Sequence, residues 1–197
     1  MADKYPEIFV LRHGQTEWNV EGRFQGRMNS ELTAKGRAQA GMQGELLAEV
    51  AKGRNDIAAH CSPQKRAMHT ARIALDPLGM VAAQDARLCE ISFGAWEGLN
   101  FEQITTGWSE HVKHADMNGF DWQFQSPGGE SFDVMRARIE GFLTSLKGPS
   151  IIVTHGITSR ILRGVWLGHV GNEIASLGGG QGCVYHLRDG QQVMLQG

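Results

Sequence analysis

Ile8-Phe9-Val10-Leu11-Arg12-His13-Gly14 joins a short, fully apolar run to an abrupt polar ending. The same combination returns in Ser150-Ile151-Ile152-Val153-Thr154-His155-Gly156. Apolar runs of this length are typical of strands that are buried on both faces of a parallel sheet. Each run stops at a histidine followed by glycine, so both strands are expected to present a histidine at their carboxyl end.

Strand-like and helix-like patterns alternate along the rest of the chain. Ser62-Pro63 predicts the start of a helix, with Ser62 as N-cap and Pro63 at the first helical position. Thr33 suits the N-cap of an earlier helix for the same reason. Together the patterns predict helices near residues 33–50, 64–75, 131–146 and 156–167, and strands near 56–61, 80–83 and 150–154.

This alternation places the chain in the α/β class, with a mostly parallel sheet covered by helices on both faces. Cys183–Leu195, around Asp189-Gly190, predicts a hairpin with a type I′ turn, and therefore at least one antiparallel strand pair. Segment 99–126 is rich in aromatic residues and too short for a domain. We expect a single domain over residues 1–197, with 99–126 as a small insertion that caps a site.

Composition excludes several classes of protein. The 197 residues include 19 Lys and Arg against 21 Asp and Glu, so nothing supports a dedicated nucleic-acid binder. No apolar run approaches the ~20 residues that cross a bilayer, and the polar start does not resemble a signal peptide. Cys61, Cys89 and Cys183 show no Cys-x-x-Cys spacing. Such cysteines are typical of a reducing compartment, so we expect a cytoplasmic protein.

Cationic side chains gather at the predicted strand ends. Arg12 and His13 follow the first strand, Lys65 and Arg66 follow the second, and His155 follows the strand at 150–154. Ligands of open α/β sheets bind beyond the carboxyl ends of the strands. A cluster of cations there, in a chain of formal net charge −2, predicts a small anionic ligand, most simply a phosphate.

Five blocks, in order along the chain, resemble the histidine phosphatase superfamily, also called phosphoglycerate-mutase-like. The blocks span most of the chain, which makes the resemblance specific. They are Leu11-Arg12-His13-Gly14-Gln15-Thr16-Glu17-Trp18-Asn19 with Arg23 and Gln25-Gly26, then Ser62 to Ala71, Leu88 to Gly98, Pro127-Gly128-Gly129-Glu130-Ser131, and Val153-Thr154-His155-Gly156.

The resemblance implies a three-layer α/β/α sandwich around a six-stranded sheet with one antiparallel strand, and chemistry through a phosphohistidine. It makes His13 the nucleophile and Glu90 the general acid and base. It also assigns the phosphoryl oxygens to Arg12, Arg66 and His155, and the pocket lining to Asn19, Gln25, Gly26 and Gly156.

Elementary chemistry supports these roles. A nucleophilic imidazole must be neutral, and neighbouring arginines disfavour its protonation. Guanidinium groups can meet the charge on the phosphoryl oxygens, so we expect no metal and no cofactor. Spacing alone does not choose between Glu90 and Glu97 as the acid, and only the resemblance favours Glu90; we take Glu97 as a surface or turn carboxylate.

Other features have simpler interpretations. His111 and His114 could face one side of a helix, but no third metal ligand accompanies them. The glycine-rich segment 178–182 lacks the ending of a phosphate loop and is expected to be a plain connection. Trp108, Phe120, Trp122 and Phe124 could cover the substrate, form the core of the insertion, or do both.

The function we expect is metal-independent hydrolysis of phosphomonoesters of small metabolites, without nucleic acid or membrane as partner. One alternative is a phosphoglycerate mutase. The mutase branch usually carries Arg-His-Tyr-Gly directly after the acid, whereas this chain has Ile91-Ser92-Phe93-Gly94. The other alternative is a non-catalytic phosphoester-binding protein, which the intact set of motif residues disfavours. The sequence indicates neither the substrate nor the oligomeric state.

Overall fold

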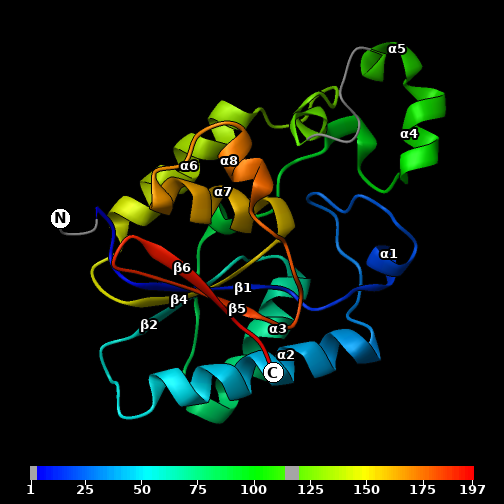
Figure 1. Ribbon diagram of the computed structural model, residues 1–197. Coiled ribbons are helices and arrows are strands. Elements are labelled where there is room, and N and C mark those ends of the chain that lie inside the picture. The colour runs from blue at the N-terminus through cyan, green and yellow to red at the C-terminus, as the bar shows by residue number, and fades with distance from the viewer. Residues whose placement is uncertain (1–3, 114–119) are drawn as a thin grey trace.

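The computed structural model describes residues 4–113 and 120–197 (Figure 1). A six-stranded sheet has the order β3-β2-β4-β1-β5-β6. Strand β5 pairs antiparallel with both β1 and β6, while β3, β2, β4 and β1 run parallel. This confirms the mostly parallel α/β sheet with one reversed strand. The strands are β1 Ile8–Arg12, β2 Ala58–Cys61, β3 Ala83–Gln84, β4 Ser150–Thr154, β5 Val184–Arg188 and β6 Gln191–Leu195.

Helices cover both faces of this sheet. Figure 1 shows α2 and α3 on one face and α6, α7 and α8 on the other. The α-helices are α1 Glu17–Val20, α2 Ala34–Ala51, α3 Lys65–Leu75, α4 Phe101–Gly107, α5 Ser109–Val112, α6 Phe132–Ser145, α7 Gly156–Leu167 and α8 Asn172–Ser176. Short 3-10 helices are η1 Asp76–Leu78, η2 Ala86–Leu88, η3 Gly94–Trp96 and η4 Asp121–Phe124.

The central strands build a separate core on each face. Ile8 and Val10 of β1 face the α6 and α7 side, whereas Phe9 and Leu11 face the α2 and α3 side. At most 1 % of the surface of each of these four residues is exposed. Successive side chains of a strand point to opposite faces, so an uninterrupted apolar run supplies both cores at once. The buried-strand interpretation of this run is therefore confirmed.

Pairing of β1 with β4 sets the position of the two histidines. Arg12 lies opposite Thr154, and the backbone N–H of His13 donates to the carbonyl of Thr154 at 2.9 Å. His13 and His155 therefore leave the sheet side by side at its carboxyl edge. This placement follows from the register alone, before any side-chain contact is considered.

Two predicted boundaries were wrong. Helix α3 begins at Lys65 with Gln64 as N-cap, and the Ser62 hydroxyl accepts from the N–H of Gln64 at 3.3 Å, before the helix, while it also contacts the His155 ring. Strand β3 is Ala83–Gln84, whereas Met80 follows the turn that ends η1, and its N–H donates back to the carbonyl of Leu75. The type I′ hairpin turn is confirmed, since Asp189 (φ 52°) and Gly190 (φ 72°) both adopt left-handed conformations.

The aromatic insertion projects beyond the three layers beside α1 (Figure 1). Its described part holds α4, α5 and η4. Phe120 and Trp122 are buried in the same core as α6 and α7, and Trp122 makes edge contacts with Phe24 and Phe101.

Among residues 4–113 and 120–197, no helix combines the length and apolar character needed to cross a bilayer.

Candidate active site

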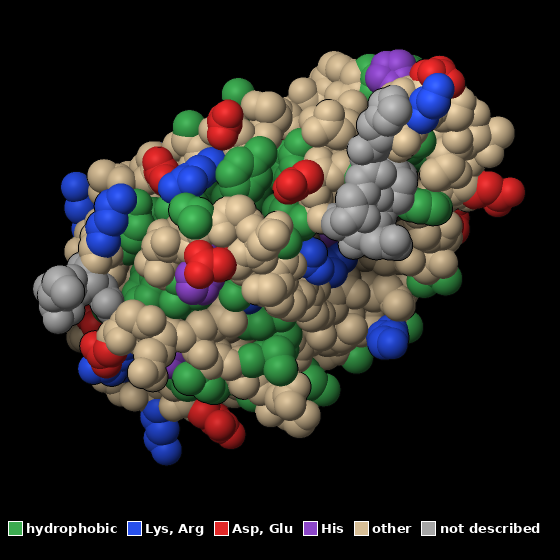
Figure 2. Space-filling model, turned by 45° about the horizontal axis from the view of Figure 1, so that its top comes forward, with side chains coloured by type: hydrophobic (Ala, Val, Ile, Leu, Met, Phe, Trp, Pro, Cys, Tyr) green, Lys and Arg blue, Asp and Glu red, His purple; other side chains and the backbone are tan. Residues whose placement is uncertain are grey.

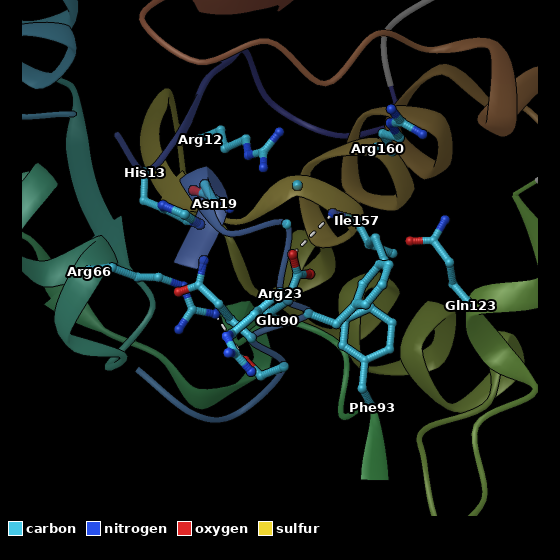
Figure 3. A pocket seen from close by; sticks show the side chains of 15 residues that line it. Arg12, His13, Asn19, Arg23, Arg66, Glu90, Phe93, Gln123, Ile157 and Arg160 are labelled. Carbon is cyan, nitrogen blue, oxygen red and sulfur yellow. Dashed lines mark hydrogen bonds between the residues drawn. The ribbon is translucent and has the colours of Figure 1, made fainter. Parts of the chain in front are cut away.

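A cavity of about 320 Å³ opens at the carboxyl edge of the sheet, between the sandwich and the insertion. Figure 2 shows basic side chains inside a hollow of the surface, and Figure 3 shows the residues that point into the cavity. It is lined by Arg12, His13, Asn19, Gly22, Arg23, Phe24, Gln25, Gly26, Arg66, Glu90, Phe93, Gln123, Gly156, Ile157 and Arg160. The lining thus contains four arginines against one carboxylate, which suits an anionic ligand.

His13 is held in one orientation at the floor of this cavity. Its ring Nδ1 lies 2.8 Å from the carbonyl of Gly14, so Nδ1 carries the proton and Nε2 keeps its lone pair. Burial lowers the pKa of His13 well below its ordinary value, and the charges of Arg66 and Arg12 lower it further. The neutral imidazole that nucleophilic attack requires is therefore the stable form at neutral pH.

His155 lies beneath the cavity lining and is completely buried. Its ring centroid is 5.2 Å from that of His13, and its Nε2 is 2.8 Å from the Ser62 hydroxyl. Its Nδ1 has no hydrogen-bond partner within the described chain. Burial lowers the pKa of His155 well below the ordinary value, with Arg66, His13 and Arg12 adding to the effect. His155 is thus a neutral ring beside His13 that does not itself line the cavity.

Arg66 is anchored from the opposite side of the site. One terminal nitrogen donates to the carbonyl of Gly26 at 2.9 Å, and the other donates to the carbonyl of Met28. Burial lowers its pKa to about 10, an effect that the nearby Glu90 opposes. Arg66 therefore keeps its charge at neutral pH, and carbonyl oxygens fix its plane without neutralising it.

Arg12 is anchored in a similar way, since its guanidinium donates to the carbonyl of Gly179 at 2.7 Å. Burial lowers its pKa, and Glu90 again acts in the opposite direction. Buried arginines with no direct carboxylate partner are costly, and a bound anion offsets that cost. The two guanidinium groups thus support the predicted phosphate-binding role.

Glu90 lies between η2 and η3, and its carboxylate contacts the first turn of α7. Oε1 accepts from the backbone N–H of Ile91 and of Thr158 at 3.1 Å, and from the Thr158 hydroxyl at 2.9 Å. Oε2 accepts from the N–H of Ile157 at 3.2 Å (Figure 3). A carboxylate at a helix N-terminus is favoured by the free N–H groups and by the helix dipole.

Glu97 has a different position, outside the cavity lining. Its Oε1 accepts from the backbone N–H of Arg27 at 2.9 Å and of Phe93 at 3.2 Å. Gly26 packs against it with φ +49°, and a Cβ there would stand 2.4 Å from Oε1. The loop that carries Gly26 therefore depends on a glycine, and Glu97 is a turn carboxylate that joins two loops, as expected.

The predicted lining residues also reach the cavity. Asn19 accepts at Oδ1 from the N–H of Thr16 and from the Gln181 amide, so its own amide N–H₂ is the group left for a ligand. Gln25 donates to the Thr16 hydroxyl at 2.7 Å. Gly156 lies against Arg12, with 3.2 Å between an added Cβ and the guanidinium carbon. The structure thus brings every residue to which the resemblance gives a site role into or directly beneath one cavity.

Lys65 does not belong to this group. It is exposed on α3 and does not line the cavity, so the prediction that it joins the cation cluster was wrong. Lys65 opens α3 one position before Arg66, and neighbouring helix positions point about 100° apart. Arg66 points inward, and Lys65 therefore faces solvent.

The motif blocks contain Arg23 and Phe93, to which sequence reasoning gave no role, and it missed Phe24, Gln123, Ile157 and Arg160 entirely. Gly156 and Arg160 lie one helical turn apart on α7, so helical spacing counted from Gly156 could have identified Arg160. Gln123 comes from η4 of the insertion, and only the tertiary fold brings it to the cavity. Trp108, Phe120, Trp122 and Phe124 do not line the cavity, so among the described residues they serve the core.

The glycine-rich segment 178–182 is more than the plain connection expected. Gly179 accepts from Arg12, and the Gln181 amide donates to the backbone carbonyl of His13 at 3.1 Å and to Asn19 at 3.2 Å. The segment therefore braces three site residues from outside. No local sequence motif could have predicted these contacts, because the residues that they join are more than 160 positions apart in the chain.

No group of three or more His, Cys, Asp or Glu side chains with the spacing of a metal site occurs in the described parts of the chain. The pair of His111 and His114 cannot be followed, because His114 lies outside the described residues. The His111 ring packs against Trp108 with 5.3 Å between centroids.

Comparison with known proteins places this geometry in a family. The model of the histidine phosphatase superfamily (branch 1) matches residues 8–194. A Hydrogenobacter thermophilus protein, provisionally named phosphoserine phosphatase 2, is 36 % identical over 160 residues, which cover 77 % of this chain and 73 % of the relative. An Enterobacter protein named "Probable phosphoglycerate mutase GpmB" is 32 % identical over 170 residues, or 82 % and 75 % of the two chains.

A solved structure gives the same answer at the level of the fold. The crystal structure of the α-ribazole phosphatase from Shigella flexneri superposes with a TM-score of 0.82 at 27 % identity, over 97 % of this chain and 96 % of that one. The family match extends over nearly the whole chain and includes all five motif blocks. The chain belongs to the histidine phosphatase superfamily and is an enzyme of that superfamily.

Proposed function

We propose that the protein hydrolyses phosphomonoesters of small metabolites through a phosphohistidine on His13, with Glu90 as general acid and base. The observation that carries this proposal is the neutral, oriented His13 ring, which has a lone pair on Nε2 and lies within the electrostatic influence of Arg66 and Arg12. A nucleophile held in this way has no need to lose a proton before it attacks.

The first half-reaction forms the phosphohistidine. His13 Nε2 attacks phosphorus, the bond to the leaving oxygen breaks, and that oxygen takes a proton from the Glu90 carboxylic acid. Arg12 and Arg66 meet the charge on the phosphoryl oxygens throughout, which is the electrostatic contribution that dominates such transfers. The free nitrogen of His155 is the third candidate contact for these oxygens.

The second half-reaction releases phosphate. The Glu90 carboxylate accepts a proton from water, the water oxygen attacks phosphorus, and the electron pair of the P–N bond returns to His13. The side chains that face the cavity supply the positive charge, so we propose a reaction without metal or cofactor. We also propose a cytoplasmic location, with small phosphorylated metabolites as partners and without nucleic acid or membrane.

A phosphoglycerate mutase is the alternative within the family, and several relatives carry the name "Probable phosphoglycerate mutase GpmB". Two sequence features support the hydrolase. Ile91-Ser92-Phe93-Gly94 follows the acid in place of Arg-His-Tyr-Gly, and the segment between the acidic block and Gly129-Glu130-Ser131 is short. A non-catalytic phosphoester-binding protein is disfavoured because the nucleophile, the acid and both arginines are present.

The test is turnover of p-nitrophenyl phosphate in EDTA by the wild type and by His13→Ala, together with an assay for acid-labile phosphoprotein. We expect metal-independent turnover and a labile phosphoprotein, both absent from the variant. Equal turnover by the variant would contradict the phosphohistidine. No hydrolysis, but transfer between phosphoglycerates, would favour the mutase, and binding without turnover would favour the non-catalytic protein.

A further inference from the structure

The two oxygens of Glu90 have unequal surroundings. Oε1 accepts three hydrogen bonds, from two backbone N–H groups and from the Thr158 hydroxyl. Oε2 accepts one, from the N–H of Ile157. The oxygen with fewer donors is the one that can carry a proton and exchange it with a ligand. Oε1 therefore anchors the side chain, and Oε2 is the acid and base atom.

Thr158 makes an unusual pair of contacts for a side chain with one proton to donate. Its hydroxyl oxygen lies 2.9 Å from Glu90 Oε1 and 2.9 Å from the backbone carbonyl of Cys89. Thr158 is fully buried. A hydroxyl has a single O–H, so it can donate to only one of these two acceptors at a time. Rotation about one bond exchanges the two hydrogen bonds without moving a heavy atom.

We propose that Thr158 is a positioning residue whose hydroxyl follows the charge of Glu90 during the two half-reactions. When Oε2 is protonated, the carboxyl group is neutral and the hydroxyl donates to the carbonyl of Cys89. When Oε2 gives its proton to the leaving oxygen, the carboxylate becomes the stronger acceptor and the hydroxyl turns to Oε1. The inference rests on the proposed function, because it needs Glu90 to cycle between acid and base.

Each step conserves protons. In the first half-reaction one proton leaves Oε2 for the leaving oxygen, while the hydroxyl keeps its own proton and changes acceptor. In the second, water returns one proton to Oε2 and the hydroxyl turns back. Arg12 from β1 and Arg66 from α3 are charged groups that interact with Glu90. Both keep their charge over the cycle, so the hydroxyl is the local group that adapts.

The test compares Thr158→Val, which removes the hydroxyl at nearly constant volume, with Thr158→Ser, which keeps it. The readout is kcat/KM against pH for two esters, glycerol 2-phosphate and p-nitrophenyl phosphate. The alkyl leaving group needs a proton from Glu90, whereas the aryl leaving group departs without one. Loss of a donor to the carboxylate favours the acid form. The high-pH limb is the pH range in which kcat/KM falls as the pH rises. In Thr158→Val, this limb should therefore move up by about one pH unit for glycerol 2-phosphate.

The same limb should stay in place for Thr158→Ser, and p-nitrophenyl phosphate should show no such shift in any variant. Thr154→Val is the matched control, because the Thr154 hydroxyl is equally buried and donates to the carbonyl of Leu88 without contacting Glu90. It should keep the wild-type limb. Thr158→Ala replaces Thr158→Val as the hydroxyl-free variant if the latter does not fold.

The outcomes separate two failures. Turnover of both esters with an unmoved limb in the hydroxyl-free variant would overturn the role of Thr158 and leave the proposed function intact. An equal shift in Thr154→Val would also overturn it, because packing would then explain the effect. A wild type that hydrolyses neither ester and forms no phosphoprotein would overturn the proposed function, and the inference with it.

Discussion

At the scale of single residues, the site holds two guanidinium charges that no carboxylate of the described residues directly neutralises. His13 is buried next to Arg12 and Arg66, and both guanidinium groups rest on backbone carbonyls. Burial lowers the pKa of His13 most, the charge of Arg66 lowers it further, and the charge of Arg12 adds a smaller effect. The motif predicted this neighbourhood, whereas the carbonyl contacts that keep the arginines in place come only from the tertiary fold.

We expect Arg66→Gln to raise the pKa of His13 relative to the wild type, because one of the two charges that disfavour the imidazolium is removed. Burial remains, so the pKa should still lie below the ordinary histidine value. Titration of the His13 ring by NMR measures this directly. Arg66→Lys keeps the charge and is the matched control; an unchanged titration in Arg66→Gln would show that burial alone sets the pKa.

At the scale of elements, strand ends were predictable and loop positions were not. The apolar runs identified β1 and β4, and their shared edge explains why Arg12, His13 and His155 meet. Segment 178–182 offered no pattern beyond its glycines, yet it returns to brace the site. Sequence periodicity reports which face of an element is buried, and it carries no information on where a loop lies after 160 intervening residues.

The contacts of segment 178–182 lead to a second prediction. Gln181→Ala removes the amide that joins the His13 carbonyl to Asn19. We expect kcat/KM for p-nitrophenyl phosphate to fall by roughly 10- to 100-fold, since small errors in the placement of a nucleophile are costly. Thermal unfolding should change little, because Gln181 is only partly buried. Gln191→Ala, at the exposed start of β6, is the control. Equal kcat/KM values in both variants would show that the Gln181 contacts do not contribute to catalysis.

At the scale of the whole molecule, the site makes stability depend on pH. His13 and His155 are buried in neutral form, and burial lowers the pKa of both. The half-buried His60 is shifted in the same direction for the same reason. Below the ordinary histidine pKa of about 6.5, the unfolded chain binds protons that the folded chain does not. Stability is therefore fully present above that pH and is lost as the pH falls.

Each fully buried histidine contributes a slope of up to about 1.4 kcal/mol per pH unit between the unfolded and the folded pKa. In urea unfolding between pH 7 and pH 5, the free energy of unfolding should thus fall, per pH unit, by more than the slope that one buried histidine contributes. His155→Gln should remove one proton from that slope, whereas His111→Gln, an exposed position on α5, should keep it. A wild-type slope near zero would mean that the two rings accept protons inside the fold, and the neutral nucleophile proposed for His13 would then have to be abandoned.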